Sequence, residues 1–106
     1  KAMQQKYEQS IQDFNLALKY NNNHSESYLG RAVSLGILGE HKEAIADYDQ
    51  YIQRVPDNGS AYLNRGKSKI NLNNYESGCA DFQKALELGV DEAKDMLNMY
   101  CKSNNQ

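Results

Sequence analysis

What the sequence lacks excludes several classes of protein. It has two Cys, one Pro and no Trp among 106 residues, and no apolar run approaches the roughly 18 residues that a membrane span needs. Two Cys are too few for a disulfide-framework mini-protein, and they lack the paired C-x-x-C spacing of a zinc site. Lys and Arg number 12 against 14 Asp and Glu, so the basic excess typical of nucleic-acid binders is missing. We therefore expect no membrane insertion, no metal site and no nucleic-acid partner.

Motifs that place catalytic or cofactor-binding groups are absent as well. The sequence contains no G-x-G-x-x-G, P-loop, G-x-S-x-G or H-E-x-x-H pattern. His24 and His41 stand at an expected loop and an expected turn, without a second His or a Cys pair at ligand spacing. Because no candidate base has an evident partner, we expect no catalytic residues, no cofactor and no enzymatic activity.

The sequence does contain an internal repeat of 34 residues, which aligns without gaps. Sliding the chain by this period places Tyr28 on Tyr62 and Arg31 on Arg65. Further matches in the same register are Leu29 with Leu63, Ser34 with Ser68, Leu38 with Leu72, Ala46 with Ala80 and Asp47 with Asp81. A partial upstream copy recurs two periods later, where Tyr7, Glu8, Asp13, Phe14, Ala17 and Leu18 match Tyr75, Glu76, Asp81, Phe82, Ala85 and Leu86.

Each copy has the apolar spacing of helices. Ile45, Tyr48 and Ile52 follow i, i+3, i+7, which is the spacing of one buried stripe. Gly39 can take the left-handed conformation that ends a helix, and Asn73 or Asn74 can do so in the next copy. These signals predict helices over residues 6–21, 25–38, 42–54, 60–72, 75–88 and 91–102.

A helix pair of this period resembles the tetratricopeptide (TPR) repeat. The residues that carry the resemblance are the aromatics Tyr28, Tyr62, Tyr48 and Phe82, the small residues Ala32, Gly66, Ala44 and Gly78, and the closing Pro56. The resemblance covers nearly the whole chain and implies an all-α fold, an α-solenoid of antiparallel helix pairs. It divides the chain into a partial TPR unit at 1–24 that supplies a second helix, TPR units at 25–58 and 59–92, a capping helix at 91–102 and a disordered tail at 103–106.

The two ends of the array are expected to differ. The capping helix can cover the preceding unit with Ala93, Met96, Leu97 and Tyr100. At the other end, Ile11, Phe14 and Leu18 are expected to face a neighbour that this chain lacks. This pattern indicates a piece of a longer array, and it leaves open self-association through the uncapped N-terminal face.

Arg and Asp residues recur with the repeat and flank the seam between the two helices of a unit. We expect Arg31 to meet Asp47 and Arg65 to meet Asp81 as structural ion pairs. Asp13 is then left unpaired, because its partner would lie in the missing first helix. The alternative register pairs Asp13 with Arg31 and Asp47 with Arg65, and an anion contact in the groove is a further alternative for the two arginines.

Cys79 begins the apolar stripe of the last full unit's second helix, and Cys101 lies near the end of a capping helix expected to run antiparallel to it. A disulfide and two free thiols are both open from this placement. The stretch from Gly78 to Cys101 is similar to the C-terminal ends of extracytoplasmic bacterial TPR proteins. That resemblance favours a bacterial extracytoplasmic location, with the cytoplasm as the alternative.

The resemblance to TPR repeats also implies a function in protein binding. First helices of TPR arrays line a concave groove for an extended or helical peptide, and the matching positions form the predicted groove. They are Leu29, Val33, Ile37, Leu63, Asn64, Lys67, Ile70, Asn71, Lys94 and Asn98. Amides such as Asn64 can bond a peptide backbone, and aliphatic side chains offer apolar contact. We expect about half of Leu29, Leu63 and Ile70 to pack inward instead.

The function that the sequence favours is a non-enzymatic protein-protein interaction scaffold that binds a peptide segment in this groove. One alternative is a purely structural segment of a longer TPR array with no ligand of its own, and an RNA-binding helical repeat is a less favoured one. TPR domains that grip acidic chaperone tails use a clamp of Lys, Asn, Asn, Lys and Arg. At those places this chain keeps Asn64 and Lys94 but has Leu29 and Val33, so we expect such tails to bind negligibly and hydrophobic peptides to be preferred.

Overall fold

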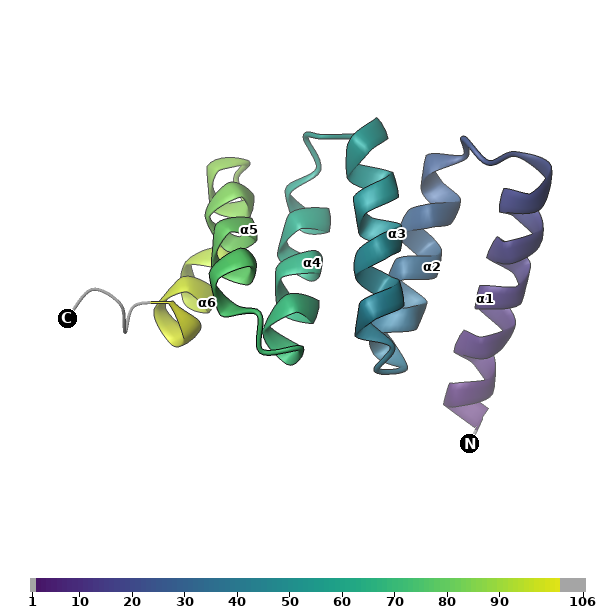
Figure 1. Cartoon of the computed structure of the whole chain (residues 1–106), viewed down its shortest axis with the longest axis horizontal. Helices are drawn as coiled ribbons and strands as arrows, with labels where there is room; N and C mark the ends of the chain where they lie inside the picture. The colour runs from purple at the N-terminus through teal and green to yellow at the C-terminus, as the bar shows by residue number, and fades with distance from the viewer. Residues whose placement is uncertain (1, 102–106) are drawn as a thin grey trace. The chain divides into compact units, whose positions relative to one another are not determined.

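The structure is a computed structural model that describes residues 2–101, and within them it contains six helices and no strand (Figure 1). The helices are α1 (Ala2–Tyr20), α2 (Ser25–Ile37), α3 (His41–Arg54), α4 (Gly59–Asn71), α5 (Tyr75–Glu87) and α6 (Glu92–Tyr100). They form two compact units, one with α1 to α3 that ends at Pro56 and one with α4 to α6 that begins at Asp57. Successive helices within each unit run antiparallel (Figure 1). None of the helices in this part of the chain is long and apolar enough to cross a membrane.

The expected helices are confirmed, and all but two of their ends lie within one residue of the prediction. The exception at the N-terminal end is α1, which begins at Ala2 and not at residue 6. Gln5 and Lys6 occupy the positions at which the other copies turn, and both are good helix formers. At the other end, α6 stops at Tyr100, and the predicted remainder of the capping helix at Lys102 and the tail at 103–106 lie outside the described residues.

The turns inside the two full repeats have the same construction. Gly39 has φ of 85° and Asn73 has φ of 65°, so both occupy the left-handed region. The amide of Gly39 donates to Gly36 and that of Glu40 donates to Leu35, which is the hydrogen-bond pattern of a Schellman motif. The amides of Asn73 and Asn74 make the equivalent bonds to Ile70 and Lys69. An Asn thus replaces the turn glycine without changing the turn, since Asn tolerates positive φ better than most side chains do.

In the first unit, α1 packs against α2 through Phe14 and Leu18. A Cβ atom placed on Gly30 of α2 would lie 2.7 Å from Phe14 Cε1, so the ring fills the space that the missing side chain leaves. Leu18 is buried. The expectation that the stripe with Phe14 and Leu18 faces outward was therefore wrong, because α2 offers a glycine that admits the ring.

In the second unit, the core lies among all three helices. Its buried members are Leu63, Ile70, Phe82, Ala85 and Ala93. Met96, Leu97 and Tyr100 of α6 pack on this cluster, and the Tyr100 ring stacks at 6.5 Å from that of Phe82. The prediction that α6 covers the preceding helices with these residues and Ala93 is confirmed.

Candidate functional site

One Arg–Asp ion pair joins the two helices of each full repeat. Arg31 Nε and Nη2 donate to the two carboxylate oxygens of Asp47, each at 2.7 Å. Arg65 bonds Asp81 in the same bidentate way, at 2.9 Å and 2.8 Å. The structure thus contains the pairing within units, and neither guanidinium is available as an anion contact. The hydrogen bond to Asp47 raises the pKa of the Arg31 guanidinium above its ordinary value, so this side chain stays charged.

The two pairs differ in their surroundings. Lys69 Nζ lies 3.0 Å from Asp81 and its side chain is only 13% exposed, so Asp81 faces two cations. The equivalent position in the first unit is Leu35, which has no charge. Arg31 instead donates a further hydrogen bond of 2.8 Å to Asn15 of α1. The sequence analysis assigns no role to Lys69. The change from Leu35 to Lys69 at equivalent positions of the two repeats is the signal that could have identified this second cation.

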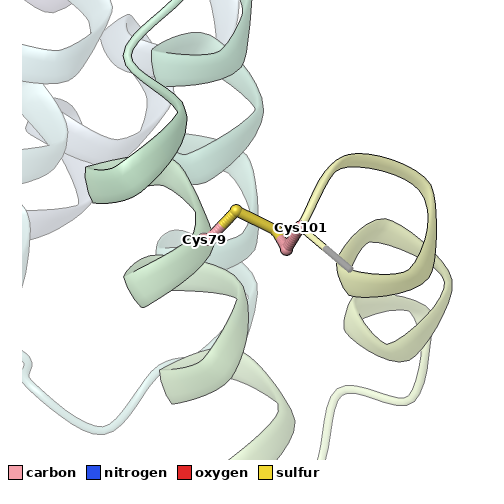
Figure 2. The surroundings of a disulfide bond; sticks show 2 residues. All are labelled: Cys79 and Cys101. Atoms are coloured by element: carbon pink, nitrogen blue, oxygen red, sulfur yellow. A yellow bond between two sulfur atoms is a disulfide. The ribbon is translucent and has the colours of Figure 1, made fainter. Parts of the chain in front are cut away.

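A disulfide joins Cys79 of α5 to Cys101, the residue that follows α6 (Figure 2). Their Cα atoms are 5.9 Å apart, and 22 residues of sequence separate them. The bond fastens the far end of α6 to the helix that α6 covers. No free cysteine remains among residues 2–101.

A hollow of about 330 Å³ lies between α4 and α6, and we call it the α4–α6 hollow. Apolar groups dominate its wall, and the Lys67 ammonium and the Asn71 amide add polar groups. Its lining residues are Lys67, Ile70, Asn71, Met96, Met99 and Tyr100. Lys67 Nζ makes an ion pair of 2.9 Å with Glu92, so its charge is already partly compensated.

A second hollow of about 350 Å³, the α1–α2 hollow, lies in the first unit. It is lined by Met3, Gln4 and Tyr7 of α1 with Ile37 and Leu38 at the end of α2. Met3 and Ile37 are among the most exposed apolar side chains of the described residues. In each hollow, one wall is the last turn of the first helix of a full repeat, α2 or α4. The other wall is α1 in the first case and α6 in the second.

The predicted groove residues fall into three groups. Leu63 is 5% exposed and belongs to the core, so it packs inward. Ile70 is also buried but borders the α4–α6 hollow beside Lys67 and Asn71. The others are half-buried or exposed on α2, α4 and α6: Leu29, Val33, Ile37, Asn64, Lys94 and Asn98.

Sequence reasoning did not assign a ligand-contacting role to the methionines and tyrosines of the hollows. On α6, Met96, Met99 and Tyr100 follow i, i+3, i+4, which is a signal for a single apolar face. The sequence analysis places Met96 and Tyr100 in the core and assigns no role to Met99. Met96 and Tyr100 pack on the core and also line the hollow, whereas Met99 lines the hollow from an exposed position.

No group of three or more metal-ligating side chains occurs within the described residues. His24 Nδ1 lies 2.6 Å from the Ser27 hydroxyl, which gives this histidine a local structural partner at the start of α2. The two hollows offer apolar surface with a few amide groups and the Lys67 ammonium beside it.

Comparison with known proteins agrees with this architecture. No curated protein matches the sequence significantly. Among solved structures, the Arabidopsis OM64 TPR domain is 26% identical with a TM-score of 0.86, covering 92% of this chain and 83% of that one. The first TPR of Spaghetti (RPAP3), bound to the HSP90 peptide SRMEEVD, is 21% identical with a TM-score of 0.88, covering 98% and 84%.

MamA from Desulfovibrio magneticus RS-1 is 20% identical with a TM-score of 0.89, and this chain covers 60% of its length. The resemblance of the C-terminal end to extracytoplasmic bacterial proteins stays a prediction. The tetratricopeptide repeat family description matches residues 25–58 and 59–88, which together make up more than half of the sequence. The chain belongs to the tetratricopeptide repeat family.

Proposed function

We propose that this chain is a non-enzymatic scaffold that binds a peptide segment, and that the peptide inserts an apolar side chain into the α4–α6 hollow. The observation that carries the proposal is the composition of that hollow. Met96 and Met99 are unbranched and adaptable, and Tyr100 adds a flat apolar wall. Such a surface accepts aliphatic or aromatic side chains of varied shape.

Polar groups beside the hollow can form hydrogen bonds with the backbone of the same peptide. The Asn71 amide donates to the Lys67 carbonyl of its own helix at 2.9 Å, and its side-chain oxygen is an acceptor for a ligand N–H. Asn64 lies two turns earlier on α4 and is half-buried. Amides at this spacing orient an extended chain without selecting its side chains.

The charges around the hollow disfavour an acidic ligand. The Lys67 ammonium is paired with Glu92, so an incoming carboxylate must compete with a carboxylate already in place. Leu29 and Val33 stand where a clamp for acidic tails would need polar donors. The HSP90 peptide in the Spaghetti complex supports peptide binding by this fold, whereas the residues here favour a more apolar sequence.

A peptide library displayed on phage, followed by calorimetric titration of the selected peptides, tests the proposal. We expect enrichment of peptides with large apolar side chains, and Met99→Asp should weaken them at least tenfold because it places a charge in the hollow. Met99 is 63% exposed, so the variant is expected to fold. Leu16→Asp is the matched control, since Leu16 is similarly exposed and lies outside both hollows.

Titration with the acidic HSP90 peptide SRMEEVD tests whether acidic ligands are disfavoured. An affinity near 10 μM or tighter that Lys94→Ala abolishes would contradict the expected preference. If no library peptide is enriched, or if Leu16→Asp weakens binding as much as Met99→Asp, the alternative of a structural segment without its own ligand is favoured.

A further inference from the structure

One wall of the α4–α6 hollow is a short helix. Met96, Met99 and Tyr100 of α6 line the hollow on that side. The helix has nine residues, and the side chain of its N-cap residue, Asp91, makes no capping hydrogen bond. Isolated helices of fewer than about 12 residues are marginal in water, so α6 depends on its contacts with the rest of the second unit. The shape of the hollow therefore depends on how firmly α6 is held.

Most of the non-covalent contacts that hold α6 are only partly buried. Among its nine residues, all of which the structure describes, only Ala93 is buried. The other apolar residues of α6 that pack on the core are half-buried. Lys67 of α4 forms an ion pair with Glu92 at the start of α6, but these side chains are 41% and 54% exposed, and exposed ion pairs contribute little to stability. The non-covalent hold on the last turn of α6 is therefore limited to half-buried side chains.

The disulfide anchors the end of α6 that forms the wall. Cys101 directly follows Tyr100, and Cys79 precedes Phe82 by three residues, which is about one turn of α5. The bond therefore lies beside the contact in which the Tyr100 ring stacks on that of Phe82 at 6.5 Å. Figure 2 shows the bond crossing from α5 to the end of α6. Both cysteines are half-buried, so the bond lies at the edge of the core and is open to a reductant.

We propose that the Cys79–Cys101 disulfide is a redox gate for the α4–α6 hollow. While the bond is intact, the last turn of α6 is held in place and the hollow accepts an apolar side chain. Reduction by a dithiol releases Met99 and Tyr100 from the wall, so the hollow loses its shape and its affinity. The inference rests on the proposed function, because it concerns the regulation of the same hollow.

The reductant is a dithiol, which supplies the two electrons and two protons of the reaction. One of its thiolates attacks a sulfur of the Cys79–Cys101 bond, which forms a mixed disulfide and releases the other sulfur to become a thiol. The second thiol of the reductant then displaces the remaining sulfur of the chain. Cys79 and Cys101 end as thiols and the reductant ends as a disulfide, and oxidation of the chain by such a disulfide reverses both steps.

The test uses indole, the ring of a Trp side chain, as the probe of the hollow. The methyl groups of the methionines are labelled with ¹³C, and nuclear magnetic resonance spectra of the full chain are recorded in the oxidised form and after reduction with dithiothreitol. Met96 and Met99 report on the hollow, whereas Met3 lies in the first unit and its signal should not respond to reduction. At indole concentrations below saturation, the change in chemical shift is proportional to the bound fraction.

We expect indole to shift the Met96 and Met99 signals of the oxidised chain, and the change in shift to be about tenfold smaller after reduction. That ratio corresponds to a docked α6 in about one reduced molecule in ten, since only the docked form has the complete wall. Hydrogen exchange should rise in α6 on reduction and stay low in α4 and α5. The control variant, Cys79→Ser with Cys101→Ser, should resemble the reduced chain and should not respond to dithiothreitol.

Three results would overturn the proposal. Equal changes in shift in the oxidised and reduced chains would mean that the bond is a cross-link without a gating role, while the proposed function of the hollow would still stand. Loss of protection in α4 and α5 together with α6 would mean that reduction unfolds the whole second unit. If indole at concentrations up to about 10 mM leaves the Met96 and Met99 signals of the oxidised chain unchanged, the proposed function fails and the gate fails with it.

Discussion

The two Arg–Asp pairs, Arg31–Asp47 and Arg65–Asp81, allow a matched test of how much a second cation contributes to a buried carboxylate. We predict that Asp81→Asn destabilises the second unit by about 3 kcal/mol and that Asp47→Asn destabilises the first by about 2 kcal/mol. Both substitutions keep the size and shape of the side chain. Both carboxylates are almost buried, with 7% and 8% of the side chain exposed.

The difference follows from the bonds that each carboxylate receives. Asp47 accepts two bonds from Arg31, whereas Asp81 accepts two from Arg65 and also pairs with Lys69 at 3.0 Å. An Asn keeps one acceptor oxygen and points an NH₂ donor at a cation. A buried bond to a charged group contributes about 1.5 to 3 kcal/mol, and part of it survives through the remaining oxygen. The additional cation at Asp81 accounts for the further ~1 kcal/mol.

Urea unfolding followed by far-ultraviolet circular dichroism measures the total loss of stability. Hydrogen exchange followed by mass spectrometry then assigns the loss to α3 or to α5, because each substitution should increase exchange in its own unit. The variant Lys69→Leu copies the side chain of Leu35 and removes the second cation. In that background, the cost of Asp81→Asn should fall to that of Asp47→Asn.

Equal costs for the two Asn substitutions in the unaltered chain would refute this reasoning, as would a cost at Asp81 that Lys69→Leu leaves unchanged. Either result would mean that Lys69 is held near Asp81 by its helix position without contributing to stability.

Two further predictions concern the ends of the chain. Replacing Cys79 and Cys101 with Ser should destabilise the second unit by about 3 kcal/mol, as expected for a cross-link over 22 residues, with the largest increase in hydrogen exchange in α6; unchanged exchange in α6 would contradict it. Gly30→Ala should destabilise the first unit by about 1 to 3 kcal/mol, because the new methyl group overlaps the Phe14 ring, and adding Phe14→Leu should recover part of the loss in urea unfolding.

The helices and their order could be predicted from the sequence because their signals are local. Gly39 and Asn73 mark turns by their own conformational freedom, and the i, i+3, i+7 spacing of Ile45, Tyr48 and Ile52 needs no knowledge of distant residues. The repeat adds independent evidence for each element, since a position uncertain in one copy is read more clearly in another.

The side-chain surroundings of the candidate site were less predictable because they depend on how each helix is rotated. A small rotation of α4 decides whether Leu63 faces the core or the solvent, and periodicity is too coarse to resolve it. The direction of the Phe14 ring depends on Gly30, because a side chain at that position would occupy the space that the ring fills. The hollow beside Met99 arises where two helices meet, and no single segment of sequence encodes such a space.

The Arg–Asp pairs have a consequence for how the chain folds. Each pair spans 16 residues, so forming it closes a short loop, whose entropic cost is low compared with that of distant contacts. Proteins dominated by such local contacts fold in microseconds to milliseconds. A ribosome adds about 5 to 20 residues per second, so a helix pair has time to close before the next pair has emerged. The chain can therefore assemble in the order in which it is made, so that Asp47 is already paired with Arg31 when Arg65 emerges.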